Sequence, residues 1–339
     1  MINLKRLLLL FCLLLFWGVA LRAQDPIYSQ FFAAPLQLNP AFAGHAYAPF
    51  VSLNHRRQWI GLGTSYVTTS AGYDQFLPKI NSGFGFSVLS DDAGDGIIKR
   101  NDISAQYAYR VQISKKYYAK LGLEAGAIQH RLDWQKLIFL DMIDPETGLT
   151  TRNGVPISSG EVAPDRLTTT VLDLSSGILF YSEQAYLGLS AKHLNTPNTY
   201  FLNINDQLNQ GLFTRWTAHG GYEFTLREAN RRRPGTYLSP NMMFVKQGPA
   251  WQLNTGLYLS TFVISAGTWF RMTNNADAMI FYVGIKPGVF KIGYSFDFTV
   301  SRLGQSTTDG THEFSLMFNF EEKRDKSKEK YQDCFKMFY

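Results

Sequence analysis

Three side chains in the middle of the sequence have the types that a hydrolase site needs. Ser190, His193 and Asn195 lie within six residues of one another, and a serine beside a histidine can act as a nucleophile and its base. The surrounding stretch predicts a regular β-strand, in which successive side chains point to opposite faces. Ser190 and His193 would then face different sides. We therefore predict no serine–histidine pair, and we expect His193 to be a strand-end residue that holds the adjacent loop.

Two acidic clusters, at residues 91–95 and 141–146, could in principle bind a cation. Closely spaced carboxylates on loops can ligate calcium, but neither cluster has the full spacing of a calcium-binding loop. Asp and Gly are also common turn residues, and we favour that role here. The sequence contains no Walker loop, GxSxG elbow, HExxH helix or cysteine metal motif. We predict no metal site, no cofactor and no enzymatic activity.

The first 23 residues have the pattern of a secretory signal peptide. Lys5 and Arg6 precede an apolar run at residues 7–17, and a small residue, Ala23, ends the segment. The apolar run is too short for a transmembrane helix, which needs about 20 residues. Cleavage after Ala23 would lower the formal net charge from the +6 of the whole chain by three, so the basic balance does not indicate nucleic-acid binding. Cys334 would be the single remaining cysteine, which excludes an intramolecular disulfide.

After residue 45 the sequence alternates between apolar and polar residues, as β-strands do. In residues 289–300, for example, every second residue is aromatic or Ile, and the residues between include Lys291 and Asp297. Most segments have the roughly 9–11 residues of a tilted membrane strand, and an even number suits a bacterial barrel. We count fourteen such segments: 50–59, 64–73, 82–90, 97–111, 116–131, 167–181, 184–194, 212–226, 236–246, 250–260, 262–272, 277–286, 289–300 and 311–320.

The lengths of the connections support a transmembrane antiparallel β-barrel with both termini in the periplasm. The two longest, 132–166 and 195–211, fall on the same side of the sheet, and the tight turns at 182–183 and 287–288 fall on the other. Outer-membrane barrels have long outer loops and short periplasmic turns. Connections 74–81 and 227–235 are long for periplasmic turns. A soluble antiparallel sandwich remains the alternative, because alternation does not identify the solvent that touches the apolar face.

Residues 24–44, QDPIYSQFFAAPLQLNPAFAG, resemble the start of the PorP/SprF family of the type IX secretion system. Further similar blocks follow in order at 83–94, 106–110, 144–145 and 186–197, so the resemblance covers almost the whole chain to Phe320. The residues that carry the motif, for which we expect structural or interaction roles, are Tyr28, Gln30, Phe31, Asn39, Pro40, Gly44, Arg57, Gln58, Trp59, His193, Gly310, His312 and Glu313.

The resemblance implies an outer-membrane barrel that assists export or cell-surface attachment of secreted proteins such as adhesins, in bacteria that include gliding species. Its partners would be outer-membrane lipids, other secretion components and a secreted surface protein. The alternative function is a barrel transporter or porin for small or hydrophobic solutes. A sealed lumen would favour the first function, and solute flux the second.

The remaining segments flank or fill the barrel that we expect at residues 50–320. Residues 24–49 contain four prolines among many apolar residues, which excludes a long helix or a central strand. A barrel of fourteen strands is wider than side chains alone can fill. We therefore expect residues 24–44 to fold into the periplasmic mouth as a plug, with Asn39 in a turn before Pro40 and Gly44 at the bend into the first strand. Packing outside the barrel or against a partner is the alternative.

Charged residues are expected in three further places. Lys291, Asp297 and Glu313 would face a solvated or salt-bridged lumen. Arg231, Arg232 and Arg233 fall in a predicted periplasmic turn, and residues 321–339 form a charged C-terminal tail. Mobile, solvated backbone is the simpler interpretation of the turn and of residues 321–330 in the tail. A docking surface for a periplasmic partner is the alternative.

Overall fold

The computed structural model describes residues 24–63, 66–152, 154–201, 211–228, 235–261, 263–274, 276–301, 304–320, 335 and 337–338. The predicted signal peptide, the three arginines at 231–233 and most of the C-terminal tail lie outside these described residues.

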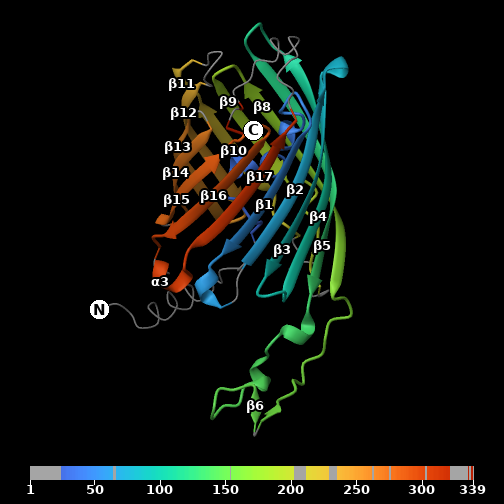
Figure 1. The fold of residues 1–339 in the computed structure, drawn as a ribbon. Coiled ribbons are helices and arrows are strands. Elements are labelled where there is room, and N and C mark those ends of the chain that lie inside the picture. The colour runs from blue at the N-terminus through green and yellow to red at the C-terminus, as the bar shows by residue number, and fades with distance from the viewer. Residues whose placement is uncertain are drawn as a thin grey trace, which may run out of the picture.

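The described chain forms one closed antiparallel β-barrel (Figure 1). Every neighbouring pair of strands is antiparallel, and the sheet closes where β1 pairs with β17 and β10 pairs with both β9 and β12. Because β10 and β11 follow one another along β12, they occupy one position, and the wall has the fourteen strands that the sequence predicts. The wall strands are β1 (Phe50–Gln58), β2 (Tyr66–Leu77), β3 (Ser82–Ala93), β4 (Ile98–Gln112), β5 (Tyr118–Leu132), β8 (Thr168–Tyr181), β9 (Ala185–Lys192), β10 (Arg215–Tyr222), β11 (Phe224–Arg227), β12 (Thr236–Gln247), β13 (Ala250–Thr261), β14 (Ile264–Met272), β15 (Ala276–Ile285), β16 (Phe290–Thr299) and β17 (Thr311–Asn319).

The connections differ at the two ends of the barrel. The longest, 133–167, carries the short strands β6 (Thr151–Arg152) and β7 (Val155–Pro156) and extends away from the wall (green in Figure 1). It leaves the same end as connection 193–214, and we call this the long-loop end. The opposite, short-turn end holds connections such as 182–184 and 286–289. One expected exception disappears, because β2 continues to Leu77 and leaves only residues 78–81 as a turn, around η4 (Pro78–Ile80).

The two faces of the wall have opposite character. Large apolar side chains face outward and are exposed, including Leu123, Leu187 and Val283. Polar and charged side chains such as Asn54, Lys120 and Glu313 face the interior and are buried. A soluble barrel would place its apolar face inside, so the soluble-sandwich alternative is wrong and the outward face suits lipid. Among the described residues, no helix combines the length and the apolar character needed to cross a membrane.

Residues 24–48, which we call the lumen segment, lie inside the barrel. They form three short helical turns, η1 (Phe31–Ala33), α2 (Pro35–Leu38) and η2 (Pro40–Phe42). Pro35 and Pro40 each stand at the start of a turn, where the missing N–H costs nothing. All but a few side chains of the segment are buried. The remaining helical turns, η3 (Ile60–Leu62), η5 (Trp134–Lys136), η6 (Leu140–Met142) and α3 (Gln305–Thr308), lie in the long-loop-end connections.

Candidate functional site in the barrel lumen

The lumen segment begins at the long-loop end, where Asp25 is held by three cationic side chains. Arg100 forms an ion pair with the Asp25 carboxylate. His193 Nε2 lies 2.7 Å from Asp25 Oδ2, and Arg215 Nη1 lies 3.2 Å from the same oxygen. Arg100 and Arg215 are near the long-loop ends of β4 and β10, and His193 directly follows β9. This group, which we call the Asp25 latch, joins strands that are distant in sequence.

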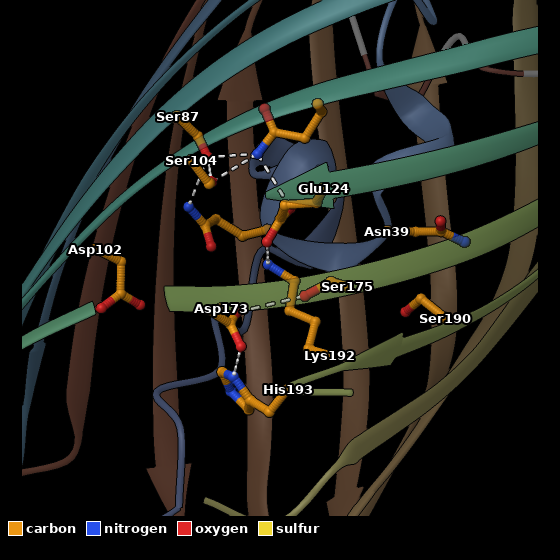
Figure 2. Close-up of polar contacts among 12 residues, drawn as sticks. Asn39, Ser87, Asp102, Ser104, Glu124, Asp173, Ser175, Ser190, Lys192 and His193 are labelled. Atoms are coloured by element: carbon orange, nitrogen blue, oxygen red, sulfur yellow. Dashed lines mark hydrogen bonds and ion pairs between the residues drawn. The ribbon is translucent and has the colours of Figure 1, made fainter. Parts of the chain in front are cut away.

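The electrostatics of the latch favour the charged forms of Asp25 and His193. Burial would raise the pKa of Asp25, but Arg100, His193 and Arg215 together hold that pKa well below its ordinary value. Burial would lower the pKa of His193, but Asp25 and Asp173 raise it overall. His193 Nδ1 lies 2.8 Å from Asp173 Oδ1 (Figure 2). With its contact to Asp25, the imidazole bridges two carboxylates.

Ser29 and Gln30 bind a second buried charge cluster, on β14, β16 and β17. The backbone N–H groups of Ser29 and Gln30 donate to the two carboxylate oxygens of Glu313, each at 2.8 Å. The Ser29 hydroxyl donates to Asp297 at 2.6 Å, and Arg271 pairs with Asp297 at 2.7 Å. Asp297 and Glu313, predicted to face a solvated or salt-bridged lumen, do face inward and are salt-bridged. Both also bind the lumen segment.

Aromatic packing follows the polar contacts. Phe32 is fully buried, and its ring lies 5.1 Å from Tyr282, 5.5 Å from Tyr258 and 5.6 Å from Trp269, measured between centroids. Phe31 also contacts Trp269, at 6.4 Å. Most of these pairs have the edge-to-face geometry that aromatic rings prefer.

The next part of the segment lies directly on the wall because the wall carries glycine there. A Cβ added to Gly177 would lie 2.0 Å from Asn39 Oδ1, and one added to Gly122 would lie 2.2 Å from the Ala41 nitrogen. Asn39 donates to the carbonyls of Ile178 and Leu189, both at 3.2 Å.

The two turn roles predicted for this part are confirmed. Asn39 Oδ1 accepts from the Ala41 N–H at 2.9 Å and so caps the turn that starts at Pro40. Gly44 has φ +63°, a conformation that favours glycine, and a Cβ there would meet the Gly83 backbone at 2.7 Å. Lys120 Nζ donates to the carbonyls of Ala43 and Gly44, at 2.7 and 3.0 Å. The chain then leaves the lumen toward Phe50 at the short-turn end.

The end of the C-terminal tail also lies inside the barrel. Phe335, Met337 and Phe338 are buried, and the Phe338 ring lies 4.6 Å from Phe42. Lys291 Nζ donates to the Met337 carbonyl at 2.6 Å. These three residues therefore lie in the lumen and not in a charged periplasmic tail, because their apolar side chains complete an aromatic cluster. Residues 321–330, for which we expected solvated backbone, lie outside the described residues.

Two further expectations need correction. We expected the plug at one mouth, the periplasmic one, but the lumen segment runs from the Asp25 latch at the long-loop end to Gly44 near the short-turn end. We also expected Ser190 and His193 on opposite faces. Both point inward, because β9 ends at Lys192 and His193 adopts a left-handed conformation with φ 61°. They still form no pair: the two side chains lie apart (Figure 2), and Ser190 donates to the Leu38 carbonyl at 2.9 Å.

The predicted motif residues separate into two groups. Eight meet at the contact between lumen segment and wall: Tyr28, Gln30, Phe31, Asn39, Pro40, Gly44, His193 and Glu313. The other five lie at the long-loop rim, where β1 meets β17: Arg57, Gln58, Trp59, Gly310 and His312. There the Trp59 N–H donates to the Gly310 carbonyl at 3.0 Å, and His312 Nδ1 lies 2.8 Å from the Tyr294 hydroxyl.

Sequence reasoning missed the residues whose importance comes from contact across the lumen. Asp25 lies in the block at residues 24–44 but is not among the motif residues that we singled out, and Arg100, Arg215 and Arg271 lie outside every block that we identified. The sequence did offer one signal for these contacts. Arg100, Arg215 and Arg271 fall at inward-facing positions of their strands, and a buried cation in a barrel wall needs an anion nearby.

The acidic loop clusters serve as turns. Asp141 accepts from the Ser159 hydroxyl and from the Gly160 N–H, and Asp144 accepts from the N–H groups of Glu146 and Thr147. Asp92 likewise accepts from the Gly96 N–H. Within the described part of the chain, no group of three or more His, Cys, Asp or Glu side chains is arranged to hold a metal ion.

Two small cavities border the lumen segment. One cavity, lined by residues that include Asp25, Glu124 and Lys192, has a volume of about 30 Å³. A second, lined by Ile27, Met243 and others, is of the same size, about 30 Å³. Cavities of this size hold water but no sugar or fatty acid. At the first cavity, Lys192 Nζ lies 3.1 Å from Glu124 (Figure 2). Glu124 also accepts from the Gln106 amide at 3.0 Å.

Comparison with known families matches residues 20–318 to the type IX secretion system membrane protein PorP/SprF. No curated protein matches the chain. Solved structures with a similar fold include a KdgM porin, with 5% identity, 80% of this chain and 99% of that chain covered and a TM-score of 0.37. A FadL homologue from Pseudomonas aeruginosa has 10% identity, covers 84% of this chain and 93% of its own, and gives a TM-score of 0.43.

Proposed function

Because the chain belongs to the PorP/SprF family of type IX secretion system membrane proteins, we propose that it is a non-enzymatic outer-membrane component of that system. Its role is to assist export or cell-surface attachment of secreted proteins such as adhesins. The long-loop end faces outside in this proposal, as long loops do in outer-membrane barrels.

The observation that carries the proposal is the filled lumen. The lumen segment crosses the barrel from the Asp25 latch to Gly44, and Phe335 and Phe338 pack against it near the short-turn end. A barrel filled by its own chain is suited to act through its ends and its outer wall. Partners would therefore bind at the 133–167 connection on one side, and at the 231–233 arginines and the tail on the other.

The alternative, a transporter or porin for small or hydrophobic solutes, needs an open path. The cavities beside the lumen segment hold only about 30 Å³ each, which is too small for such solutes. A transport role would require the lumen segment to leave its contacts, including the ion pairs of Asp25 and the hydrogen bonds to Glu313.

A deletion strain tests the proposal against the alternative. Intact wild-type, deleted and complemented cells are labelled with a membrane-impermeant biotin reagent, and the labelled proteins are identified by mass spectrometry. We expect surface proteins with type IX sorting domains to fall in the deleted strain and to accumulate in the periplasm. An unchanged set of surface proteins, together with reduced uptake of a small solute, would instead support the transporter.

A further inference from the structure

One part of the outer wall departs from the apolar character of the rest. His55, Thr69, Ser90, Asn101, Gln129 and Thr170 all face outward and are exposed. Each is the direct cross-strand partner of the next, so they form a continuous row over β1, β2, β3, β4, β5 and β8. With about 4.8 Å between strands, the row is about 24 Å wide. We call it the polar row.

The polar row lies close to the long-loop ends of its strands. His55 is three residues before the end of β1 at Gln58, and Gln129 is three residues before the end of β5 at Leu132. The side chains pair among themselves: His55 Nδ1 lies 3.0 Å from Thr69 Oγ1, and Ser90 donates to Asn101 at 2.9 Å. No hydrogen bond found among the described residues uses the Asn101 amide N–H groups or the second ring nitrogen of His55, so these groups can bind a ligand.

An apolar groove adjoins the polar row on the side of the membrane core. It has a volume of about 870 Å³ and is lined by outward side chains that include Leu53, Val88, Ile103 and Phe314, together with members of the row. Binding sites for small ligands have volumes of about 300–1,000 Å³. On a wall that faces lipid, the matching occupant is a set of acyl chains.

Cations border the polar row on its other side. Arg57, Lys99 and Arg131 lie two positions beyond His55, Asn101 and Gln129 respectively, and all three are exposed. Lys99 and Arg131 are direct cross-strand partners, an arrangement that is unfavourable between like charges. Lys99 pairs with Asp92 at 3.5 Å, whereas no ion pair found within the described residues involves Arg131.

A second hollow extends the site at its cationic edge. It has a volume of about 620 Å³, shares Gln129 with the groove, and is lined by Arg131, Asp133 and Trp134 among others. Tryptophan is enriched at the membrane–water interface. An anion beside Arg131 would relieve its repulsion with Lys99.

We propose that this part of the wall binds a phosphorylated glycolipid of the outer leaflet. The phosphate is bound by Lys99 and Arg131, the sugar hydroxyls by the polar row, and the acyl chains by the groove below. The width of the row favours a saccharide head over the smaller head of a phospholipid. The choice of outer leaflet rests on the long-loop end facing outside, and the site itself is independent of the secretion role.

Native mass spectrometry of the purified, delipidated protein tests the proposal. Bisphosphorylated lipid A, phosphatidylglycerol and phosphatidylethanolamine are added separately to the protein in detergent. We expect one lipid A to be retained at concentrations where neither phospholipid is. Lys99→Ala with Arg131→Ala should weaken lipid A binding about tenfold or more, because two charge-assisted contacts are lost. Lys115→Ala with Lys116→Ala, an exposed pair at the short-turn end, should leave it unchanged.

Two further measurements keep the proposal testable if the charge variant fails to assemble. Dephosphorylated lipid A should bind the wild-type protein at least about tenfold more weakly. Val88→Trp, which fills the groove, should abolish retention, whereas Val283→Trp on another exposed part of the wall should not. Equal retention of phosphatidylglycerol, or wild-type affinity in the charge or groove variant, would overturn the glycolipid site.

Discussion

Asp25 shows how a buried carboxylate can hold a segment in place. Its ion pairs with Arg100, His193 and Arg215 replace the water that burial removes. Removing one partner of a buried ion pair typically costs about 3–5 kcal/mol, since the other charges stay buried without compensation. The latch should therefore matter more to docking of the lumen segment than any single apolar contact within it.

The first prediction tests this carboxylate. Asp25→Asn keeps the shape of the side chain but removes the anion that Arg100, His193 and Arg215 share. Arg100 keeps Asp102 and His193 keeps Asp173. These contacts lie on the wall, so the start of the lumen segment should become mobile. The measurement is the fluorescence anisotropy of a label on Gln24→Cys in a Cys334→Ser background, since Gln24 is exposed. Anisotropy should fall in Asp25→Asn and stay unchanged in Asp165→Asn, an exposed carboxylate on the long connection. Unchanged anisotropy in both would contradict the latch.

The second prediction concerns pH at the same place. The pKa of His193 is raised, so its contribution is fully present below the ordinary value of about 6.5 and is lost as pH rises through the raised pKa. The pKa of Asp25 is lowered, so its contribution is lost only as pH falls through that low value. The other charged groups of the latch are Arg100 and Arg215, and the Asp173 carboxylate faces the opposite ring nitrogen of His193.

Label anisotropy at Gln24 should accordingly decrease as pH rises above neutrality. His193→Gln removes the titrating group, so the same titration should show no such decrease in that variant. A wild-type profile that is flat between pH 6 and about 10 would be incompatible with a protonated His193 in the latch.

The third prediction concerns the glycines under the lumen segment. Gly177→Ala places a methyl group about where Asn39 Oδ1 now lies, so the segment must move off the wall. Opening of the lumen should then appear as increased single-channel conductance in planar bilayers. Gly160→Ala is the matched control, because its Cβ would meet only Asp141, at 3.7 Å. Equal conductance of Gly177→Ala and Gly160→Ala would mean that the wall accommodates the added methyl group without opening of the lumen.

At the scale of elements, the strands were predictable and the path of the lumen segment was not. Alternation in β16 and β17 identified the outward and inward residues correctly, because one face meets lipid and the other meets polar groups. The burial of residues 24–44 followed from their apolar content and the width of the barrel. The direction in which the segment runs through the barrel did not follow from the sequence, because it depends on the contacts of Asp25 with Arg100 and Arg215 across the lumen.

The C-terminal tail was misjudged for a similar reason. Residues 321–330 are dominated by charge, which predicts solvated chain, and the pattern gave no weight to the aromatic residues that follow. Phe335 and Phe338 find their partners in Phe42, Tyr181 and Tyr186, on elements far away in sequence. Local periodicity contains no information on such contacts.

The fourth prediction concerns the lumen segment as a unit. Deleting residues 25–44 behind an intact signal peptide should leave a barrel that conducts far more than the full-length protein, because the wall strands retain all their mutual hydrogen bonds. Deleting residues 144–163, an equal length of the long connection, is the control and should not change conductance. If the barrel without residues 25–44 assembles and conducts no more than wild type, the segment does not seal the lumen.

The whole molecule has two distinguishable ends, and its orientation decides how each could act. Connection 133–167 and the Asp25 latch lie at one end, whereas the turns 113–117 and 182–184 lie at the other. The start of the lumen segment and the longest connection must therefore face the same compartment. With the long-loop end outside, the lumen segment begins at the cell surface although its next strand, β1, starts from the periplasmic side.

The fifth prediction tests that orientation. Trypsin added to intact cells should cleave the 133–167 connection, which exposes Lys136 and Arg166, and should spare Lys115 and Lys116. It should also spare Arg231–Arg233, which the sequence places in a turn at the same end. After permeabilisation of the outer membrane, trypsin should also cleave at Lys115, Lys116 and Arg231–Arg233. Comparison of the same sites in intact and permeabilised cells provides the control. Cleavage at Lys115 or at Arg231–Arg233 in intact cells would reverse the orientation. It would also place Asp25 in the periplasm and move the proposed glycolipid site to the inner leaflet, where it could not meet its ligand.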